Sequence, residues 1–280
     1  MRRSEGAPTR LVIEAGRAEA HYWRDLWRYR ELFYFLSWRD VLVRYKQTAI
    51  GIAWALVRPF LTMVVFNVIF SSLAKLPSEG GAPYPIMVFA GMLPWQFFAN
   101  SLSEAGGSLV GNANLISKVY FPRLIIPASS VVTSFFDFLV SGVIMAGLML
   151  WYQFFPGWRL VTLPLFVALA LAAALGAGLW LTAMNVRYRD FRYIIPFIVQ
   201  FGLYISPVGF SSGIVPERWR LPYSLNPMVG VIDGFRWALL GDQVELFVPG
   251  FACSVLVSVL LLSSGVWYFR RMERSFADVI

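Results

Sequence analysis

The sequence predicts an all-α integral membrane protein, and three observations lead to that class. Of the 280 residues, 58 % are hydrophobic and only 14 % are charged, whereas soluble domains carry roughly 25 % charged residues. Apolar runs of about 20 residues recur along the chain, which is the length that an α-helix needs to cross a bilayer. A soluble domain of this size could not bury so much apolar surface, so lipid must solvate a large share of it.

The chain begins with residues 1–20, an arginine-containing tail without the apolar core of a signal peptide, so we expect no cleavage there. Residues 21–47 follow as a predicted amphipathic helix. Its helical period brings four apolar residues roughly together: Leu26, Phe33, Trp38 and Val41. Such a helix lies at the membrane interface with its aromatic residues at headgroup depth and its cations facing phosphates. The simpler alternative is an anchor that only fixes topology.

We predict that six apolar stretches cross the membrane, within a transmembrane domain of residues 48–270. The stretches are 50–73, 84–102, 124–152, 160–186, 194–210 and 247–269. With the amino terminus inside, all but five of the 24 Lys and Arg residues fall on the inner side; the five are Lys75, Arg159, Arg218, Arg220 and Arg236. The positive-inside rule therefore predicts that both termini are cytoplasmic, with residues 271–280 as the carboxy-terminal tail.

The first stretch contains Arg58 and Pro59 where an apolar run should be smoothest. Proline lacks the backbone donor, so we expect the helix to bend or restart at Pro59. Arg58 then lies at the inner interface and reaches phosphates. If the span instead begins at Ile50, Arg58 lies about 12 Å inside and must face a partner or a channel.

Residues 211–245 are too polar to cross the membrane and too apolar for a free loop. We predict two short helices that dip into the outer leaflet, the second at residues 225–240. Irregular backbone at this depth is tolerated only against protein or a water-filled cavity. The region is a candidate lid for an outward exit.

Asp137 is the clearest carboxylate within a span. Either Ser134, Ser141 or a partner helix satisfies its hydrogen bonds, or it lies on a transport path. A single such group argues against ion-driven transport. Two stripes of small residues allow close helix packing, which we expect within one subunit rather than between two copies; the stripes are Ala170, Ala174 and Gly178, and Gly107 and Gly111.

Several kinds of chemistry are not predicted. The chain has no GxxxxGK[ST] phosphate loop, so it does not bind and hydrolyse ATP by that route. The single cysteine, Cys253, and the single histidine, His21, do not predict a metal site. No paired acidic residues indicate catalytic residues.

Five segments occur in order between residues 44 and 241: RYKQTAIGIAWALVRPF, PYPIMVFAGMLPWQFFANSL, NANLISKVYFPRLIIP, NVRYRDFRYIIPFIVQFGLYISPVGF and LNPMVGVIDGFRWALLG. In these the chain resembles the permease subunit of ABC-2-type polysaccharide exporters, which move O-antigens, teichoic acids and capsular chains across bacterial cytoplasmic membranes. The resemblance implies a type V-like ABC exporter fold in the inner membrane: six spans, the interface helix first, and re-entrant outer gate helices before the last span.

The resemblance also implies a function and partners. The chain would be the channel-forming permease that exports a lipid-linked polysaccharide, with O-antigen as the first candidate and capsular polysaccharide or teichoic acid next. It would act as a homodimer with two separately encoded ATPase subunits, which hold ATP and Mg; the chain itself would bind no cofactor or nucleic acid and would not be an enzyme. A drug or lipid ABC-2 exporter is a further alternative, and a membrane scaffold for glycan-synthesis enzymes is the alternative outside transport.

Four groups of site residues follow from the resemblance and from charge. The coupling loop, residues 112–123, would contact the ATPase through Asn114, Lys118, Tyr120, Phe121, Pro122 and Arg123. The channel wall would include Trp54, Arg58, Phe66, Phe70, Phe201 and Tyr204, although aromatic residues in a membrane helix commonly serve packing and position 58 is more often neutral in relatives. The outer gate would include Asn226, Pro227, Asp233 and Arg236. A lipid pyrophosphate would enter past Arg24, Arg28 and Arg30. Membrane lipids would be further partners.

Overall fold

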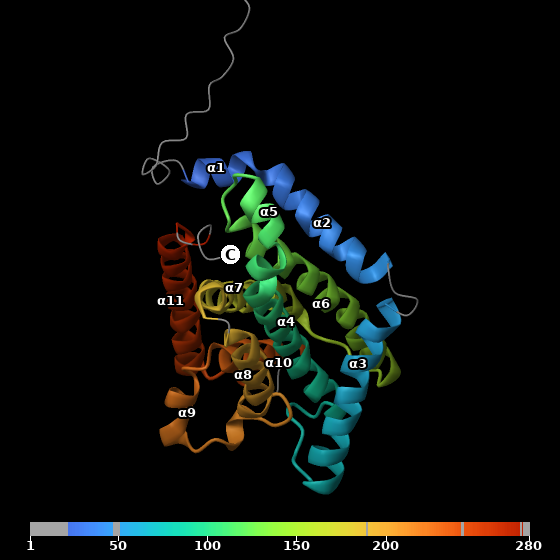
Figure 1. Ribbon diagram of the computed structural model, residues 1–280. Helices are drawn as coiled ribbons and strands as arrows, with labels where there is room; N and C mark the ends of the chain where they lie inside the picture. Colours follow the sequence, from blue (N-terminus) through green and yellow to red (C-terminus); the bar gives the residue numbers. More distant parts are fainter. Residues whose placement is uncertain (1–21, 47–50, 189, 242–243, 275, 277–280) are drawn as a thin grey trace, which may run out of the picture.

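The computed structural model describes residues 22–46, 51–188, 190–241, 244–274 and 276. Every regular element within these ranges is a helix (Figure 1). In chain order they are α1 (Tyr22–Arg28), α2 (Arg30–Lys46), α3 (Gly51–Phe66), η2 (Asn67–Leu73), α4 (Tyr84–Gly111), α5 (Ala113–Lys118), α6 (Ile125–Trp151), η3 (Trp158–Thr162), α7 (Leu163–Arg187), α8 (Phe191–Ile205), η4 (Ser212–Ile214), α9 (Glu217–Tyr223), α10 (Pro227–Leu239) and α11 (Val248–Glu273). The predicted all-α class is confirmed for the described residues.

Helix α4 forms the centre of the bundle. It packs against α6 and α7 along much of its length, and α10, α8 and α3 cover further parts of its surface. Ile86, Met87, Val88 and Ala90 have no exposed surface. Because α4 lies among other helices rather than in lipid, it carries polar residues that a lipid-facing span would not tolerate.

Four helical stretches in the described part of the chain are long and apolar enough to cross a bilayer: Leu56–Leu73, Ile125–Trp151, Trp158–Arg187 and Val248–Glu273. They correspond to the first, third, fourth and sixth predicted spans. Helix α4 has 28 residues and extends about 42 Å, but its composition is less apolar. Helix α8 has 15 residues and extends about 22 Å, which is shorter than the hydrocarbon core of roughly 30 Å. The count of six spans stays a prediction.

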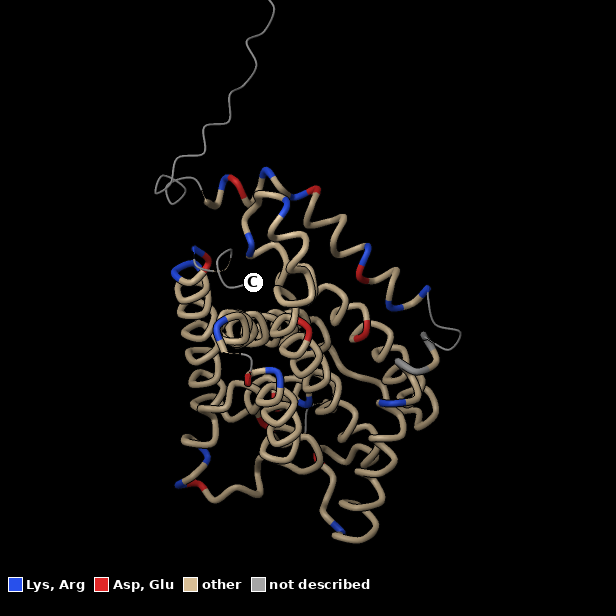
Figure 2. Tube along the Cα trace, in the orientation of Figure 1, with Lys and Arg blue, Asp and Glu red and all other residues tan. Residues whose placement is uncertain are grey.

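The two ends of the bundle differ in charge. One end holds α1, α2, α5 and the last turn of α11, and Lys and Arg residues gather there (Figure 2). We call it the basic end. The other, which we call the opposite end, holds the loop before α4, together with η4 and α9. Since basic loops stay on the cytoplasmic side, the basic end is the one predicted to face the cytoplasm.

The predicted interface helix is divided into α1 and α2. The two meet at Tyr29, where backbone bonds from Tyr29 N to Asp25 O (2.9 Å) and from Phe33 N to Tyr29 O (3.1 Å) continue across the joint. Helix α2 then lies along α6. The helical hydrogen bonding therefore persists through the joint, and the segment stays on the surface of the bundle.

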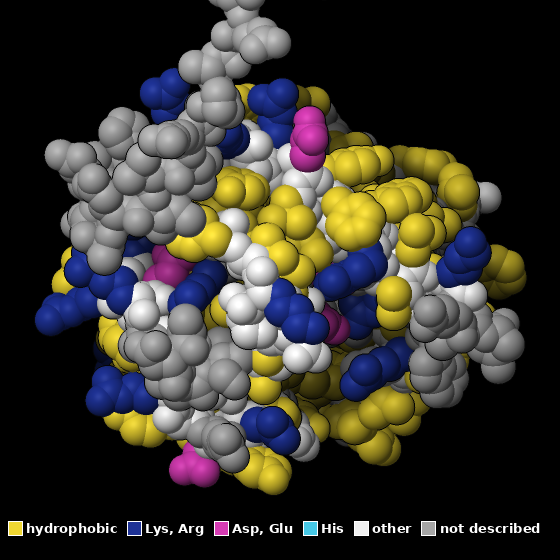
Figure 3. Space-filling view, turned by 45° about the horizontal axis from the view of Figure 1, so that its top comes forward, with side chains coloured by type: hydrophobic (Ala, Val, Ile, Leu, Met, Phe, Trp, Pro, Cys, Tyr) yellow, Lys and Arg dark blue, Asp and Glu magenta, His cyan; other side chains and the backbone are white. Residues whose placement is uncertain are grey.

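The predicted apolar face of this segment is only partly covered by the bundle. Leu36 and Val41 are buried, whereas Trp38, about 60° from Val41 around the helix, is 47 % exposed and accessible to the membrane interface. The buried face is set by Leu36 and Ser37, and position 38 lies about 100° further around the helix from Ser37, toward the surface. Figure 3 brings the basic end forward and shows hydrophobic side chains there interspersed with Lys and Arg, a pattern typical of a membrane interface.

Small residues bring α7 against two neighbours. A Cβ on Gly265 of α11 would lie 2.4 Å from the Gly176 carbonyl oxygen of α7, and a Cβ on Gly178 would lie 2.9 Å from the Ala105 Cβ of α4. Ala170 and Ala174 are fully buried. The stripe at 170, 174 and 178 therefore packs within one subunit, as predicted.

The second stripe of small residues behaves differently. Gly107 and Gly111 have open space where a Cβ would stand. The expectation that they pack within one subunit is therefore wrong, because they lie on the uncovered side of the last turns of α4. Contact with a second copy stays a prediction for them.

Candidate functional site

The predicted coupling loop is a short helix, α5, at the basic end. Asn114 and Lys118 are exposed on it, and Tyr120 is 56 % exposed just after it. Phe121 and Pro122 are buried instead. Three of the predicted coupling residues are thus accessible to a partner, whereas two hold the loop on the bundle.

Arg123 fastens this loop to the end of the last helix. Its backbone N–H donates to the Glu273 carboxylate at 2.7 Å, and its guanidinium donates to the Glu273 backbone carbonyl. Each side chain therefore binds the backbone of the other residue. Such bonds satisfy groups at a helix end that would otherwise lack partners.

Tyr22 at the start of α1 joins the same cluster. The Arg270 guanidinium lies 4.5 Å from the centroid of the Tyr22 ring. Burial and the neighbouring Glu273 carboxylate raise the pKa of Tyr22 above its usual range, so the phenol stays neutral. We call Tyr22, Arg123, Arg270 and Glu273 the basic-end hub.

An apolar core lies beneath the hub. The Phe269 and Phe276 rings meet edge-on with their centroids 5.3 Å apart. Phe121 of the coupling loop belongs to the same cluster, as do residues of α2, α4 and α7. Helices α1, α5 and α11 are therefore packed into one unit, although they are far apart in sequence.

Asp137 of α6 has its partners on α2. The Arg44 guanidinium lies 3.0 Å from one carboxylate oxygen of Asp137 and 2.9 Å from Glu104 of α4, and the Tyr45 hydroxyl donates to Asp137. Burial and this hydrogen bond raise the pKa of Tyr45, which keeps the phenol protonated as a donor. A partner helix thus satisfies Asp137, as one predicted alternative had it. The Ser134 hydroxyl is buried without a hydrogen-bond partner among the described residues, so the alternative that used Ser134 is wrong.

A second polar contact fixes α2 to the start of the coupling loop. The Arg39 guanidinium donates to the Asn112 side-chain oxygen at 3.1 Å, and the Asn112 amide donates to the Ser108 carbonyl at 2.9 Å. The interface segment is therefore attached both to the coupling loop and to the centre of α6. The sequence did not predict these contacts of Arg39 and Arg44. The signal that could have indicated them is the group of cations near the end of α2, since cations close to apolar helices need anionic or polar partners.

The residues predicted for a channel wall lie in different environments. Phe201 and Tyr204 of α8 are 55 % and 63 % exposed, and Phe197 stacks on Phe201 with 5.2 Å between ring centroids. Phe66 is buried and Phe70 half-buried, because both pack against Gly209. Arg58 is exposed on α3, and the side chain of Trp54 lies outside the described residues.

The segment after α8, residues 206–210, has no regular helix, and its polar groups are held by side chains of other elements. Tyr223 of α9 donates to the Ile205 carbonyl (2.7 Å), and Asn226 donates to the Ser206 hydroxyl (2.9 Å). Tyr84 of α4 donates to the Gly209 carbonyl (2.5 Å). We call these contacts, together with those of Arg236, the 205–210 clamp. Irregular backbone within a membrane protein requires such internal partners.

Arg236 of α10 completes the clamp from a fully buried position. Its guanidinium donates to the carbonyls of Val208 (2.9 Å) and Phe210 (2.7 Å), and the Glu79 carboxylate lies 3.9 Å away. Arg236 and Asn226 are among the residues that the resemblance predicted for an outer gate, which stays a prediction. Sequence reasoning missed Tyr84 and Tyr223, because a phenol that donates to a distant backbone carbonyl leaves no pattern in the sequence.

The remaining predicted residues belong to the outer gate and to the lipid-headgroup entrance. Pro227 begins α10, and the Asn226 side chain caps that helix by accepting from Met228 N at 3.1 Å. Arg24, Arg28 and Arg30 are exposed at the basic end. The last of these lies over the Trp27 ring at 5.6 Å.

An all-helical bundle in which several helices are long and apolar enough to cross a bilayer is the architecture of a multi-pass membrane protein. The chain belongs to the ABC-2 type transporter family, whose model matches residues 31–240. It is 30 % identical over 259 residues to an O-antigen export system permease protein of Myxococcus xanthus, covering 92 % of this chain and 98 % of that protein. A protein of the same description from Klebsiella pneumoniae is 24 % identical over 89 % of this chain and 95 % of its own length. An inner membrane transport permease of Escherichia coli K12 is 25 % identical over 73 % of this chain and 82 % of its own length.

Proposed function

We propose that this chain is the channel-forming permease of an ATP-driven exporter that moves lipid-linked O-antigen polysaccharide from the cytoplasm to the periplasm. The observation that carries the proposal is the 30 % identity, over 92 % of the chain, to an O-antigen export permease. Two copies would enclose the path with α4 and α8 completing six spans in each, since one bundle of this kind encloses little space.

A separate ATPase would bind at α5 and move this helix during its hydrolysis cycle. Asn114, Lys118 and Tyr120 are the exposed residues available to such a partner. Because Arg123 and Glu273 tie this loop to the end of α11, a displacement of α5 would carry the last helix with it as a rigid body. The basic-end hub is thus a means of passing movement into the membrane.

The glycan would pass the exposed aromatic face of α8, including Phe201 and Tyr204. Aromatic rings attract sugar rings by dispersion without fixing one hydrogen-bond geometry, so successive units could slip past. The exposed cations Arg24, Arg28 and Arg30 would attract the pyrophosphate of the lipid carrier at the basic end.

A deletion strain tests the proposal. We expect surface polysaccharide to disappear while its lipid-linked form accumulates inside the cell, and an intact copy of the gene to reverse both effects. The identity of the lost glycan separates O-antigen from capsule and teichoic acid. Loss of glycan synthesis without accumulation would favour a scaffold for synthesis enzymes, and unchanged surface glycan would contradict export altogether.

A further inference from the structure

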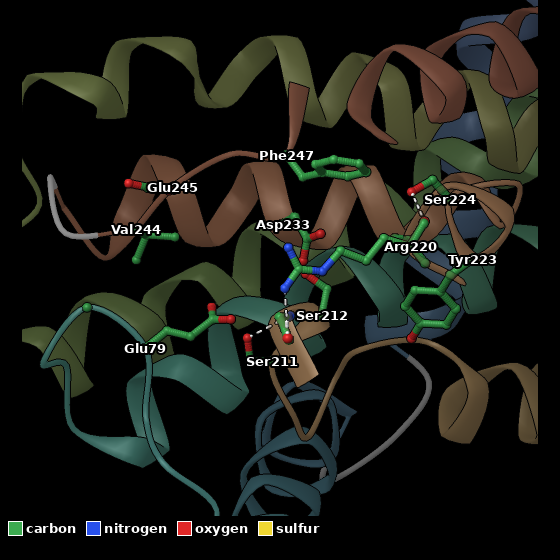
Figure 4. A pocket seen from close by; sticks show the side chains of 13 residues that line it. Glu79, Ser211, Ser212, Arg220, Tyr223, Ser224, Asp233, Val244, Glu245 and Phe247 are labelled. Carbon is green, nitrogen blue, oxygen red and sulfur yellow. Dashed lines mark hydrogen bonds between the residues drawn. The ribbon is translucent and has the colours of Figure 1, made fainter. Parts of the chain in front are cut away.

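A cavity of about 250 Å³ lies among the loops of the opposite end (Figure 4). Its wall is formed by the loop before α4, the segment after α8, helices α9 and α10, and the residues just before α11. At one edge Gly80 has φ +62°, and a Cβ there would lie 2.8 Å from the Val244 side chain. The positive φ at Gly80 favours glycine, and the turn that it forms places the neighbouring Glu79 in the wall of the cavity.

The cavity combines separated polar groups with aromatic surface. Figure 4 places Glu79, Asp233 and Arg220 around it, with the Phe247 and Tyr223 rings at its edges. The Arg220 guanidinium is fixed by the carbonyls of Gly213 (2.9 Å) and Val215 (3.1 Å). The wall thus offers hydrogen-bond donors and acceptors at separate points, beside the apolar faces of two aromatic side chains. A sugar matches this arrangement, because its hydroxyl groups surround a ring whose two faces are apolar.

Other ligand classes fit less well. A divalent cation needs converging carboxylates, but no three His, Cys, Asp or Glu side chains in the described ranges are grouped closely enough to hold a metal. An anionic sugar would meet the carboxylates of Glu79, Asp233 and Glu245 in the wall, which disfavour it. The volume suits one ring rather than a chain.

We propose that this cavity binds one neutral hexopyranose or N-acetylhexosamine unit of the exported glycan, a proposal that rests on the export function above. Tyr223 both lines the cavity and donates to the Ile205 carbonyl at the end of α8. A bound sugar would therefore lie beside the 205–210 clamp, where the aromatic face of α8 ends. The site would hold a unit of the glycan at the outer mouth.

Saturation-transfer NMR on the purified full-length permease in nanodiscs tests this site, with D-mannose, D-galactose and N-acetyl-D-glucosamine as probes. A small, partly open site predicts weak, millimolar binding of at least one of them. Asp233→Asn should weaken that binding by about tenfold or more, because it removes the charge from a hydrogen bond. Ser212→Phe should abolish binding by filling the cavity. Because Ser212 is partly exposed but hydrogen-bonds Asp233, an unchanged unfolding curve of this variant in SDS is the check that lost binding is not lost folding.

Glu217→Gln is the matched control, since Glu217 is an exposed carboxylate of α9 outside the wall of the cavity. It should leave binding unchanged. Absence of saturation transfer from all three sugars, equal binding by the Ser212→Phe variant, or displacement of the sugar by calcium chloride would overturn the proposal. Export that persists in the Ser212→Phe variant would refute a part for this site in export, whereas unchanged surface glycan in the deletion strain would refute the export function itself.

Discussion

The reciprocal contact between Arg123 and Glu273 predicts an unusual double-mutant cycle. Glu273→Ala removes the acceptor of the Arg123 backbone N–H, which should cost about 1–3 kcal/mol of unfolding free energy for an unpaired, partly buried donor. Arg123→Ala removes the donor to the Glu273 carbonyl, which should cost about 1–2 kcal/mol. Each substitution leaves the bond made by the other side chain in place. The double variant should therefore lose nearly the sum, with a coupling energy below about 1 kcal/mol that reflects only the attraction between the two charges.

The four proteins of this cycle can be compared by unfolding in mixed micelles with increasing SDS, under conditions where refolding is reversible. Glu217→Ala controls for the loss of an exposed carboxylate and should change stability by less than about 0.5 kcal/mol. A direct ion pair between the two side chains would give a coupling energy of roughly 1.5–3 kcal/mol. Coupling of that size would refute the reciprocal arrangement.

Three further predictions concern the interior. Gly265→Ala should lower the unfolding free energy by about 1–3 kcal/mol because it forces α7 and α11 apart, whereas Gly147→Ala, with open space around it, should not; the same SDS titration measures both. Asp137→Ala should destabilise the protein by about 1–3 kcal/mol because Arg44 loses a partly buried partner, and adding Arg44→Leu should restore part of that loss; failure of this rescue would count against the ion pair. Arg236→Met should release the segment after α8, so limited proteolysis there should become faster, and an unchanged cleavage rate would show that the clamp does not depend on this residue.

Hydropathy and charge were sufficient to predict the all-α class, because both depend on residues that are close in sequence. The partners of Asp137 could not be predicted in the same way. Tyr45 lies 92 positions before Asp137, and nothing in either local sequence specifies the pairing. The sequence indicated that the carboxylate needed a partner, but only the packing of α2 along α6 supplies it.

The channel residues show a second limit. A helical wheel assumes 3.6 residues per turn, but residues 67–73 form a π-helix, in which hydrogen bonds span five residues. Side chains after Asn67 therefore point at angles that a period of 3.6 residues does not predict. Phe66 and Phe70, which the resemblance placed in a channel wall, turn toward Gly209 in the bundle. Phe201 and Tyr204 of α8, placed there by the same resemblance, are exposed.

The contact between α2 and Asp137 has a consequence for biogenesis. Synthesis proceeds from the amino terminus, so Arg44 and Tyr45 leave the ribosome before α6 is made. A carboxylate near the centre of a membrane helix costs roughly 2.5–3.5 kcal/mol at insertion. Because its partners are already present at the membrane surface, α6 can offset this cost as it enters. A circular permutant that places α2 after α11 would deliver Asp137 to the translocon before any partner exists, and its insertion should be less efficient than that of the natural order.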